Sequence, residues 1–172
     1  MTCRSETLDD QSEIFKVNQL AFGRDTEANL VEALRSNPKA YIRDLSIVAW
    51  IGTQIVGHIM FTRIHIKSKN GTVHESLALG PMAVRPDHQK QGIGGLLIQE
   101  GLARSRHLGY GSVVVLGHPS YYPRFGFRPA YLWGITSPFD VPPEAFMAIE
   151  LVRGKLDKVS GEVEYPREFM EI

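Results

Sequence analysis

Apolar residues near the start of the chain recur with the spacing of an α-helix. A first helix is predicted over about residues 10–22, with Gly23 ending it. A second is predicted from about Thr26, with its apolar side chains turned inward, and it closes at Asn37-Pro38. A short strand within residues 2–8 precedes both. The chain therefore begins with two amphipathic helices, whose apolar faces are expected to pack against a sheet.

The pattern then changes to that of β-strands. Residues 45–51 and 54–66 are rich in β-branched and aromatic residues, and the second stretch alternates between two faces. Asn70-Gly71 is the strongest hairpin signal in the chain, and it joins the second stretch to a third strand over residues 73–84. These strands predict an antiparallel meander at the centre of the fold.

A loop and a further helix follow the third strand. Arg85-Pro86 breaks regular structure, and apolar residues from Ile93 onward return to helical spacing up to about Leu108. A buried strand is predicted over residues 112–116 and a late one over 145–151. Because strand, helix and strand follow one another at this spacing, a parallel crossover is expected, and the fold class is α/β of the α+β type.

Composition limits the classes of function. The 172 residues are 43% hydrophobic and 22% charged, which is typical of a folded protein and long enough for one domain over residues 1–172. Nineteen basic residues balance nineteen acidic ones. A chain without net charge has no global field to hold nucleic acid or an anionic membrane surface. We therefore expect neither as a partner.

The remaining composition points to a cytoplasmic protein without a metal. The single cysteine, Cys3, has no partner for a disulfide and no metal-ligand spacing. No signal-peptide pattern and no apolar run of membrane-spanning length are present, so a cytoplasmic location is expected. The tail over residues 153–172 has few apolar anchors. It could pack on a second copy in a homodimer or fold back on its own domain.

The loop before the third helix has the chemistry of an anion site. Glycines at Gly92 and Gly94 remove the Cβ atoms that would hold a ligand off the backbone, at a helix end whose amides lack partners. A Walker loop is absent, and a dinucleotide fingerprint would need glycine where Leu97 stands. Taken alone, the loop is equally consistent with a tight connection between a strand and a helix that binds no ligand.

Two motifs together resemble a known superfamily. Gln-x-x-Gly-x-Gly at residues 89–94 is similar to the acetyl-CoA pyrophosphate loop of the GNAT N-acetyltransferases, and Tyr122-x-x-x-Gly126-Phe127 is similar to their second signature. The resemblance covers about residues 4–133, and the string over residues 116–127 is similar to a bacterial subgroup of predicted N-acetyltransferases. His118 stands where that subgroup would have aspartate, so no role is carried over to it from the resemblance.

The resemblance implies the GNAT acyl-CoA N-acyltransferase fold. Its central sheet would be mixed but mostly antiparallel, with helices on both faces. The sheet would splay between the strands at about 77–84 and 112–116, and the cleft at their C-terminal ends would hold the ligands.

The resemblance also implies acetyl-CoA as co-substrate and no metal. Pantetheine would pair with the third strand, and the diphosphate would lie on the loop and the start of the helix. The expected cofactor-binding residues are Met82, Ala83, Val84, Gln89, Lys90, Gln91, Gly92, Ile93, Gly94 and Gly95.

Catalysis requires a proton donor for the departing thiolate and removal of a proton from the amine. A phenol suits the first role, which falls to Tyr122, with Tyr121 as the alternative. The candidate bases are His118, beside the cleft, and Glu75, on the cofactor strand; His58 and His74 also lie on or near the central strands, and bound water could serve instead.

The expected function is transfer of an acetyl group to a primary amine of a small molecule or protein, by direct attack in a ternary complex. The alternative is a non-catalytic module of the same fold that binds or senses acyl-CoA. The acceptor could rest at the loop over residues 22–26, with Phe22, Trp133 and Phe139 as lining candidates.

Overall fold

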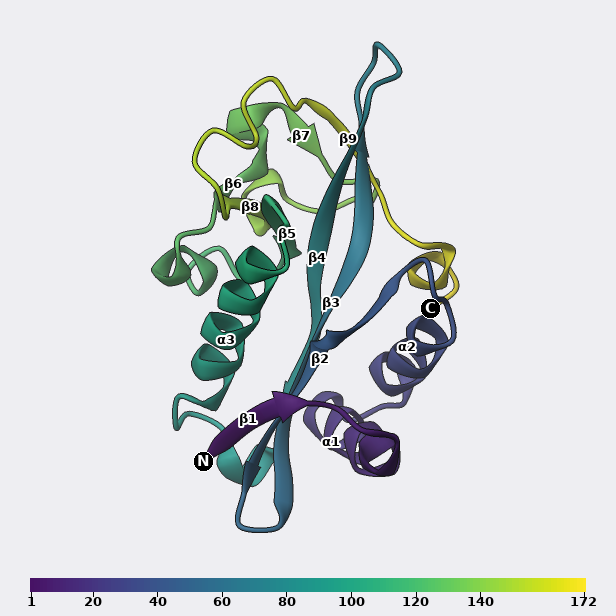
Figure 1. Ribbon diagram of the computed structural model, residues 1–172, viewed down its shortest axis with the longest axis vertical. Helices are drawn as coiled ribbons and strands as arrows, with labels where there is room; N and C mark the ends of the chain where they lie inside the picture. Colours follow the sequence, from purple (N-terminus) through teal and green to yellow (C-terminus); the bar gives the residue numbers. More distant parts are fainter.

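The computed structural model describes residues 1–172, in which strands from Thr2 to Glu164 join into one sheet (Figure 1). The helices are α1 (Gln11–Phe22), α2 (Thr26–Arg35) and α3 (Ile93–His107). The strands are β1 (Thr2–Ser5), β2 (Tyr41–Ile51), β3 (Gln54–Lys67), β4 (Val73–Val84), β5 (Ser112–Leu116), β6 (Arg128–Pro129), β7 (Ile135–Thr136), β8 (Phe146–Glu150) and β9 (Gly161–Glu164). Short 3₁₀ turns include η3 (Tyr122–Phe125) and η6 (Arg167–Met170).

The sheet is mixed and mostly antiparallel, as predicted. Its strand order is β1-β2-β3-β4-β5-β8-β6, with β9 pairing β3 and β7. Only the β4–β5 and β7–β9 pairs are parallel. The predicted hairpin at Asn70-Gly71 joins β3 to β4, and α3 with its flanking strands forms the predicted crossover.

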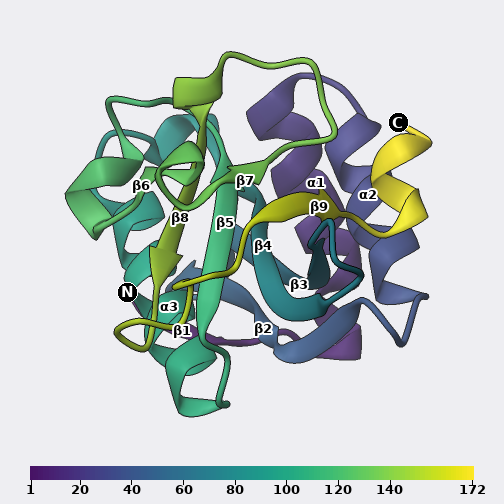
Figure 2. The same ribbon diagram turned by 90° about the horizontal axis from the view of Figure 1, so that it is seen from above.

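Helices cover both faces of the sheet (Figures 1 and 2). On one face, Ile14 and Val17 of α1 pack with Met60 of β3. On the other, Leu97 of α3 packs in one core with Phe61 of β3. Successive β3 side chains point to opposite faces, and both faces are covered, so the strand is buried along most of its length.

The two central strands separate at their C-terminal ends. The parallel pairing of β4 with β5 runs from Leu77–Val113 to Leu79–Val115 and stops there. Gly80 and Pro81 follow, and Pro81 has no amide to donate to a neighbouring strand. The β3–β4 register also shifts at this point. The predicted splay is confirmed, and it exposes the end of β4 from Met82 onward.

The tail folds back on the domain rather than extending from it. It contains β9, which sequence patterning missed, and β9 pairs with the end of β3. η6 then packs beside α2, where Asn37 Nδ2 donates to the Glu168 carboxylate at 3.0 Å. Tyr165 and Phe169 pack against each other, with ring centroids 5.0 Å apart. The tail therefore becomes part of the wall of the cleft.

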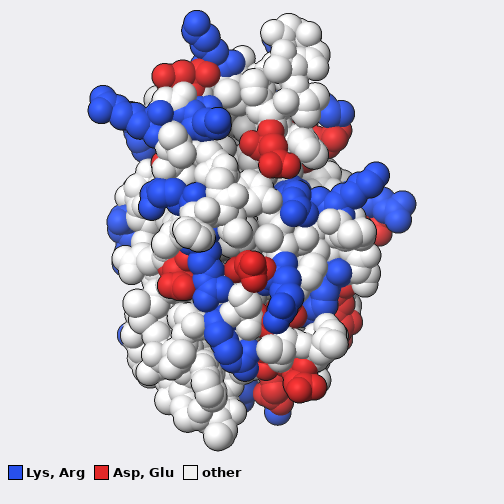
Figure 3. All heavy atoms as spheres, viewed as in Figure 1, with Lys and Arg blue, Asp and Glu red and all other residues white.

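The other element predictions differ only at their boundaries. β2 begins at Tyr41, four residues before the predicted start, and the late strand β8 spans Phe146–Glu150. No helix has the length and apolar composition needed to cross a membrane. Over the face seen in Figure 3, basic and acidic side chains are interspersed.

Candidate active site

The N-terminus of α3 is open to a ligand. Gly92 is the N-cap in a left-handed conformation (φ 84°), and no side chain caps this end of the helix. The first helical hydrogen bond runs from the Leu96 amide to the Gly92 carbonyl at 3.1 Å. The amides of Ile93, Gly94 and Gly95 therefore have no partner within the helix, which leaves three donors and the positive end of the helix dipole at one place.

The end of β4 presents backbone groups toward the same place. The Arg85 amide donates to the Val56 carbonyl of β3 at 2.8 Å. Because alternate residues of a strand direct their amides to opposite edges, the amides of Met82 and Val84 face the edge from which β5 has departed. Gln89 Nε2 donates to the Val84 carbonyl at 3.1 Å, so the loop is tied to the strand on that side.

A cavity of about 600 Å³ lies between β4, the loop and the start of α3. Nine of the ten predicted cofactor-binding residues line it, and Gln91 does not. Among the further residues that line this cavity, sequence reasoning missed the His88 imidazole and the Arg124 guanidinium. Arg124 lies inside the second motif, so its position there could have indicated a role beside the loop. For His88 we find no such signal.

The tyrosine pair of the second motif is divided between two cavities. Tyr121 lines the cavity at α3, and the Arg124 guanidinium lies 4.7 Å from the centre of its ring. Tyr122 meets Tyr121 edge to face, with ring centroids 5.1 Å apart, but lines the neighbouring cavity instead. Adjacent residues in one turn thus serve different sides of the cleft.

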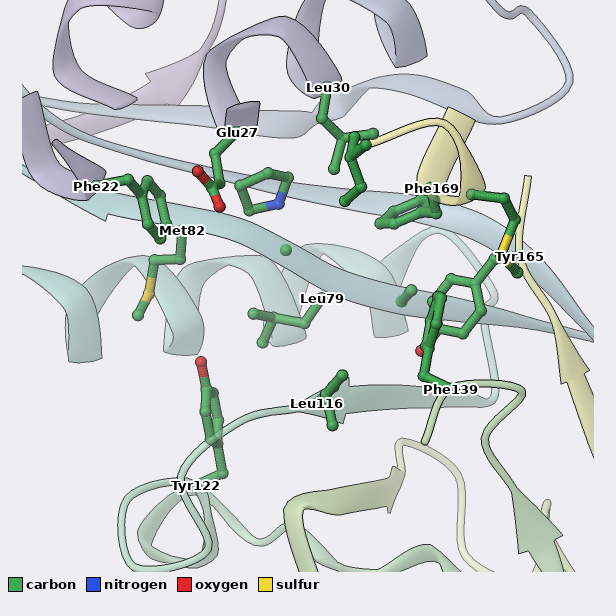
Figure 4. Close-up of a pocket in the computed structure, with 15 residues that line it drawn as sticks. Phe22, Glu27, Leu30, Leu79, Met82, Leu116, Tyr122, Phe139, Tyr165 and Phe169 are labelled. Carbon is green, nitrogen blue, oxygen red and sulfur yellow. The ribbon is translucent and has the colours of Figure 1, made fainter. Parts of the chain in front are cut away.

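The second cavity measures about 760 Å³ and is mainly apolar (Figure 4). It is lined by Phe22, Glu27, Leu30, Ala78, Leu79, Gly80, Pro81, Met82, Leu116, Tyr122, Phe139, Tyr165, Phe169, Met170 and Ile172. Phe22 and Met82 line both cavities. The two cavities therefore meet at the splay, where β4 leaves β5.

Tyr122 brings a protonated hydroxyl to this meeting point. Figure 4 shows the Tyr122 hydroxyl and the Glu27 carboxylate entering the apolar cavity from opposite sides, with Leu79 and Met82 between them. Burial raises the pKa of Tyr122 to about 12. The phenol is consequently a neutral acid at physiological pH and can donate a proton.

Glu27 is the charged residue of the apolar cavity, and sequence reasoning did not identify it. It lies in the first turn of α2, next to the loop expected to hold the acceptor. The Arg24 guanidinium donates to both oxygens of its carboxylate, at 2.9 and 2.6 Å, and lowers its pKa. An isolated glutamate in a helix carries no sequence signal for this position, because only the packing of α2 on α1, and of α1 on the sheet, brings it to the cleft.

The predicted bases do not lie at the meeting point. Glu75 and His74 line a separate cavity of about 340 Å³. Glu75 is seven residues before Met82 on β4, which is roughly 23 Å along an extended strand. His118 lines neither cavity of the cleft. The geometry therefore argues against Glu75 and His74. His118 contacts the site through its backbone, since the Tyr121 amide donates to its carbonyl at 3.1 Å.

His58 is also removed from the site, because it is fully buried. Its Nε2 lies 2.9 Å from the Ser46 hydroxyl and its Nδ1 lies 3.3 Å from Asn18 Nδ2. Burial lowers its pKa to about 3, so the ring is neutral. Among the acceptor-lining candidates, Phe22 and Phe139 line the apolar cavity. Trp133 does not line it and instead packs against the core under β7 and β8.

Two proteins of Escherichia coli are similar to this chain in sequence. The chain is 40% identical over 136 residues to the uncharacterized N-acetyltransferase YjhQ of Escherichia coli K12, covering 78% of this chain and 74% of that protein. It is 30% identical to the uncharacterized N-acetyltransferase YhbS of the same strain, over 98% of both chains.

Solved structures agree with these sequence relatives. The crystal structure of E. coli YhbS in complex with CoA superposes with a TM-score of 0.90, covering 98% of this chain and 91% of that one. A GNAT family acetyltransferase from Brucella melitensis in complex with acetyl-CoA gives 0.79 at 35% identity, covering 98% and 97%. The acetyltransferase (GNAT) domain family matches residues 2–130. The chain therefore belongs to the GNAT family of N-acetyltransferases.

Proposed function

We propose that the protein transfers an acetyl group from acetyl-CoA to a primary amine by direct attack in a ternary complex. The observation that carries this proposal is that the two cavities of the cleft share Phe22 and Met82. One cavity offers backbone amides and cations, which suit a cofactor diphosphate. The other is apolar and suits an acceptor. A thioester at their junction would be accessible from both.

The cofactor would lie along the first cavity. Its diphosphate would accept hydrogen bonds from the free amides at the start of α3, where the helix dipole favours negative charge. Lys90 and Arg124 line the same cavity and would add positive charge. Pantetheine would pair with the free edge of β4. The complexes of the two similar proteins with CoA and acetyl-CoA support this assignment.

The β4 edge would also stabilise the transition state. As the amine attacks, negative charge develops on the thioester oxygen. The amide of Met82 or Val84 faces the splay and would donate to that oxygen. Removing one such donor typically costs roughly 3–4 kcal/mol of transition-state stabilisation.

In the chemical step the amine nitrogen forms a bond to the thioester carbon, and the carbon–sulfur bond breaks. Tyr122 would give its phenolic proton to the departing thiolate and recover one from solvent. An amine that binds as an ammonium would lose one proton to solvent water before it attacks and a second one afterwards, because none of the predicted bases lines the junction. CoA and an N-acetylated amine are the products.

Turnover measured with a panel of primary amines tests the proposal. We expect acetyl-CoA to bind in calorimetry and CoA release to depend on the amine, with a product heavier by one acetyl group in mass spectrometry. Tight binding of acetyl-CoA without turnover on any amine would favour the sensing module instead. Absence of acetyl-CoA binding would overturn the proposal.

A further inference from the structure

The apolar cavity combines a large nonpolar wall with one charged group. Twelve of its fifteen lining residues are hydrophobic, and Glu27 has the one charged side chain among them. The hydrophobic side chains come from α1, α2, β4, the end of β5, η3, the loop at Phe139 and the C-terminal segment. Its volume of about 760 Å³ suits a small molecule rather than a single ion or water.

Glu27 keeps its negative charge and retains capacity for a ligand. Arg24 reaches the carboxylate from the solvent side, since its side chain is 63% exposed and that of Glu27 only 14%. Arg24 does not line the cavity. Each carboxylate oxygen has two acceptor positions, and Arg24 donates one hydrogen bond to each oxygen. A cation in the cavity can therefore bind the same carboxylate without displacing Arg24.

We propose that the acceptor is an amphiphilic primary amine, a single ammonium on an aliphatic or aromatic body, and that Glu27 binds the ammonium. This inference rests on the proposed function and names its substrate class. The body would lie against Leu79, Leu116 and Phe139. The ammonium would lie between Glu27 and the thioester, opposite Tyr122.

The same walls disfavour other amines. A polyamine would bury a second ammonium with no second acidic side chain to pair it, and an amino sugar would bury hydroxyls without partners. Glu27 would serve in binding rather than as the base, because the Arg24 hydrogen bond lowers its pKa and makes it a weak proton acceptor.

A series of n-alkylamines from propylamine to hexylamine tests the apolar wall, because these amines share nearly one pKa. Each buried methylene is expected to raise kcat/KM about fourfold, or about sixtyfold across the series. The chain-matched diamine 1,6-diaminohexane is expected to be at least about a hundredfold poorer than hexylamine, because its second charge would be desolvated. A flat series, or a preference for the diamine, would overturn the inference.

Glu27→Gln tests the charged group. We expect KM for hexylamine to rise about tenfold or more, as for loss of a charge-assisted hydrogen bond, with unchanged affinity for acetyl-CoA. Inhibition by 1-hexanol, which shares the body but not the charge, should stay within about twofold of wild type. Glu32→Gln, an exposed residue on the same helix, is the matched control and should change neither value. An unchanged KM in Glu27→Gln would refute its role.

Failure of this inference can be told from failure of the proposed function. Acetylation of polyamines or peptide lysines in preference to alkylamines would overturn the substrate class and leave the acetyltransferase assignment intact. If acetyl-CoA does not bind, the proposed function fails. In that case, calorimetry compares the affinities of the free protein for hexylamine and 1,6-diaminohexane, and so tests the selectivity of the cavity independently of acetyl transfer.

Discussion

The Tyr121 hydroxyl lies 3.3 Å from the point that a Cβ atom on Gly94 would occupy. The second motif therefore packs directly onto the helix end formed by the first, although 27 residues separate the two positions. A methyl group at Gly94 would make a tight contact there, and the Tyr121 hydroxyl would have to shift by only a few tenths of an ångström. The same absence of a side chain keeps the helix amides accessible to an anion.

Gly94→Ala is accordingly expected to weaken acetyl-CoA binding about tenfold while leaving the fold as stable as wild type or more so, because alanine is the better helix former. Calorimetry gives the affinity, and thermal unfolding gives the stability. Acetyl-pantetheine, which lacks the diphosphate, is the control ligand, and its affinity should change little. Unchanged affinity for acetyl-CoA would exclude the helix end as the diphosphate site.

Tyr122→Phe is expected to lower kcat about a hundredfold with little change in KM, as for loss of a general acid. Tyr121→Phe, which alters the adjacent ring in the other cavity, serves as control and should lose less than about fivefold. Since the pKa of Tyr122 is about 12, no decline in rate below about pH 10 should depend on this residue. Equal kcat values for the two variants would remove Tyr122 from the mechanism.

The burial of neutral His58 leads us to expect that the folded protein loses stability in mild acid. Its pKa is about 3 in the folded protein and 6.5 in the reference state, so the unfolded chain binds a proton that the folded one excludes. Stability is therefore full above about pH 6.5 and falls as pH drops toward 3, by about 2 kcal/mol between pH 7 and 5.

Urea unfolding at pH 7 and pH 5 measures this dependence. His58→Gln should be less stable than wild type at pH 7, because it disturbs the contacts with Ser46 and Asn18. Its stability should also change less between the two pH values. His107→Gln alters an exposed histidine at the end of α3 and should retain the wild-type dependence. A pH dependence in His58→Gln equal to that of wild type would contradict the explanation.

Gly161→Ala is expected to detach the tail. Gly161 has φ 148°, and a Cβ there would lie 2.0 Å from the Lys67 carbonyl oxygen of β3. The substitution should cost about 2–3 kcal/mol of unfolding free energy through strain and the loss of β9 pairing. It should also raise KM for the amine, because Tyr165 and Phe169 of the tail line the acceptor cavity. Gly154→Ala, at another positive-φ turn of the tail, is the comparison for strain alone.

Local patterns accounted for much of the fold. The Asn70-Gly71 hairpin, the crossover through α3 and the inward face of α2 all depend on turn chemistry and on apolar spacing within a few residues. β9 was missed because Gly161–Glu164 has one buried apolar residue, Val163, and gains its hydrogen bonds from β3 and β7. The sequence of such a strand does not indicate a strand, because the strand is stabilised mainly by the neighbouring strands with which it pairs.

The candidate site likewise combines features that local sequence predicts with features that only the fold reveals. The loop from Gln89 to Gly95 is contiguous, so its glycines and the open helix end could be recognised from the order of residues alone. Glu75 was favoured because it shares a strand with Met82, but a strand is extended, and residues seven apart lie far from each other. Glu27 faces the cleft although its sequence neighbours give no indication of it.

The order of residues thus specified the helices, the central strands and the glycine-rich loop before α3, since each depends on contacts between near neighbours. Which carboxylate and which tyrosine face the apolar cavity, and how the tail closes that cavity, were decided only in three dimensions. These features depend on the angle at which β4 leaves β5 and on the packing of segments more than a hundred residues apart. Those are long-range effects that no local pattern encodes.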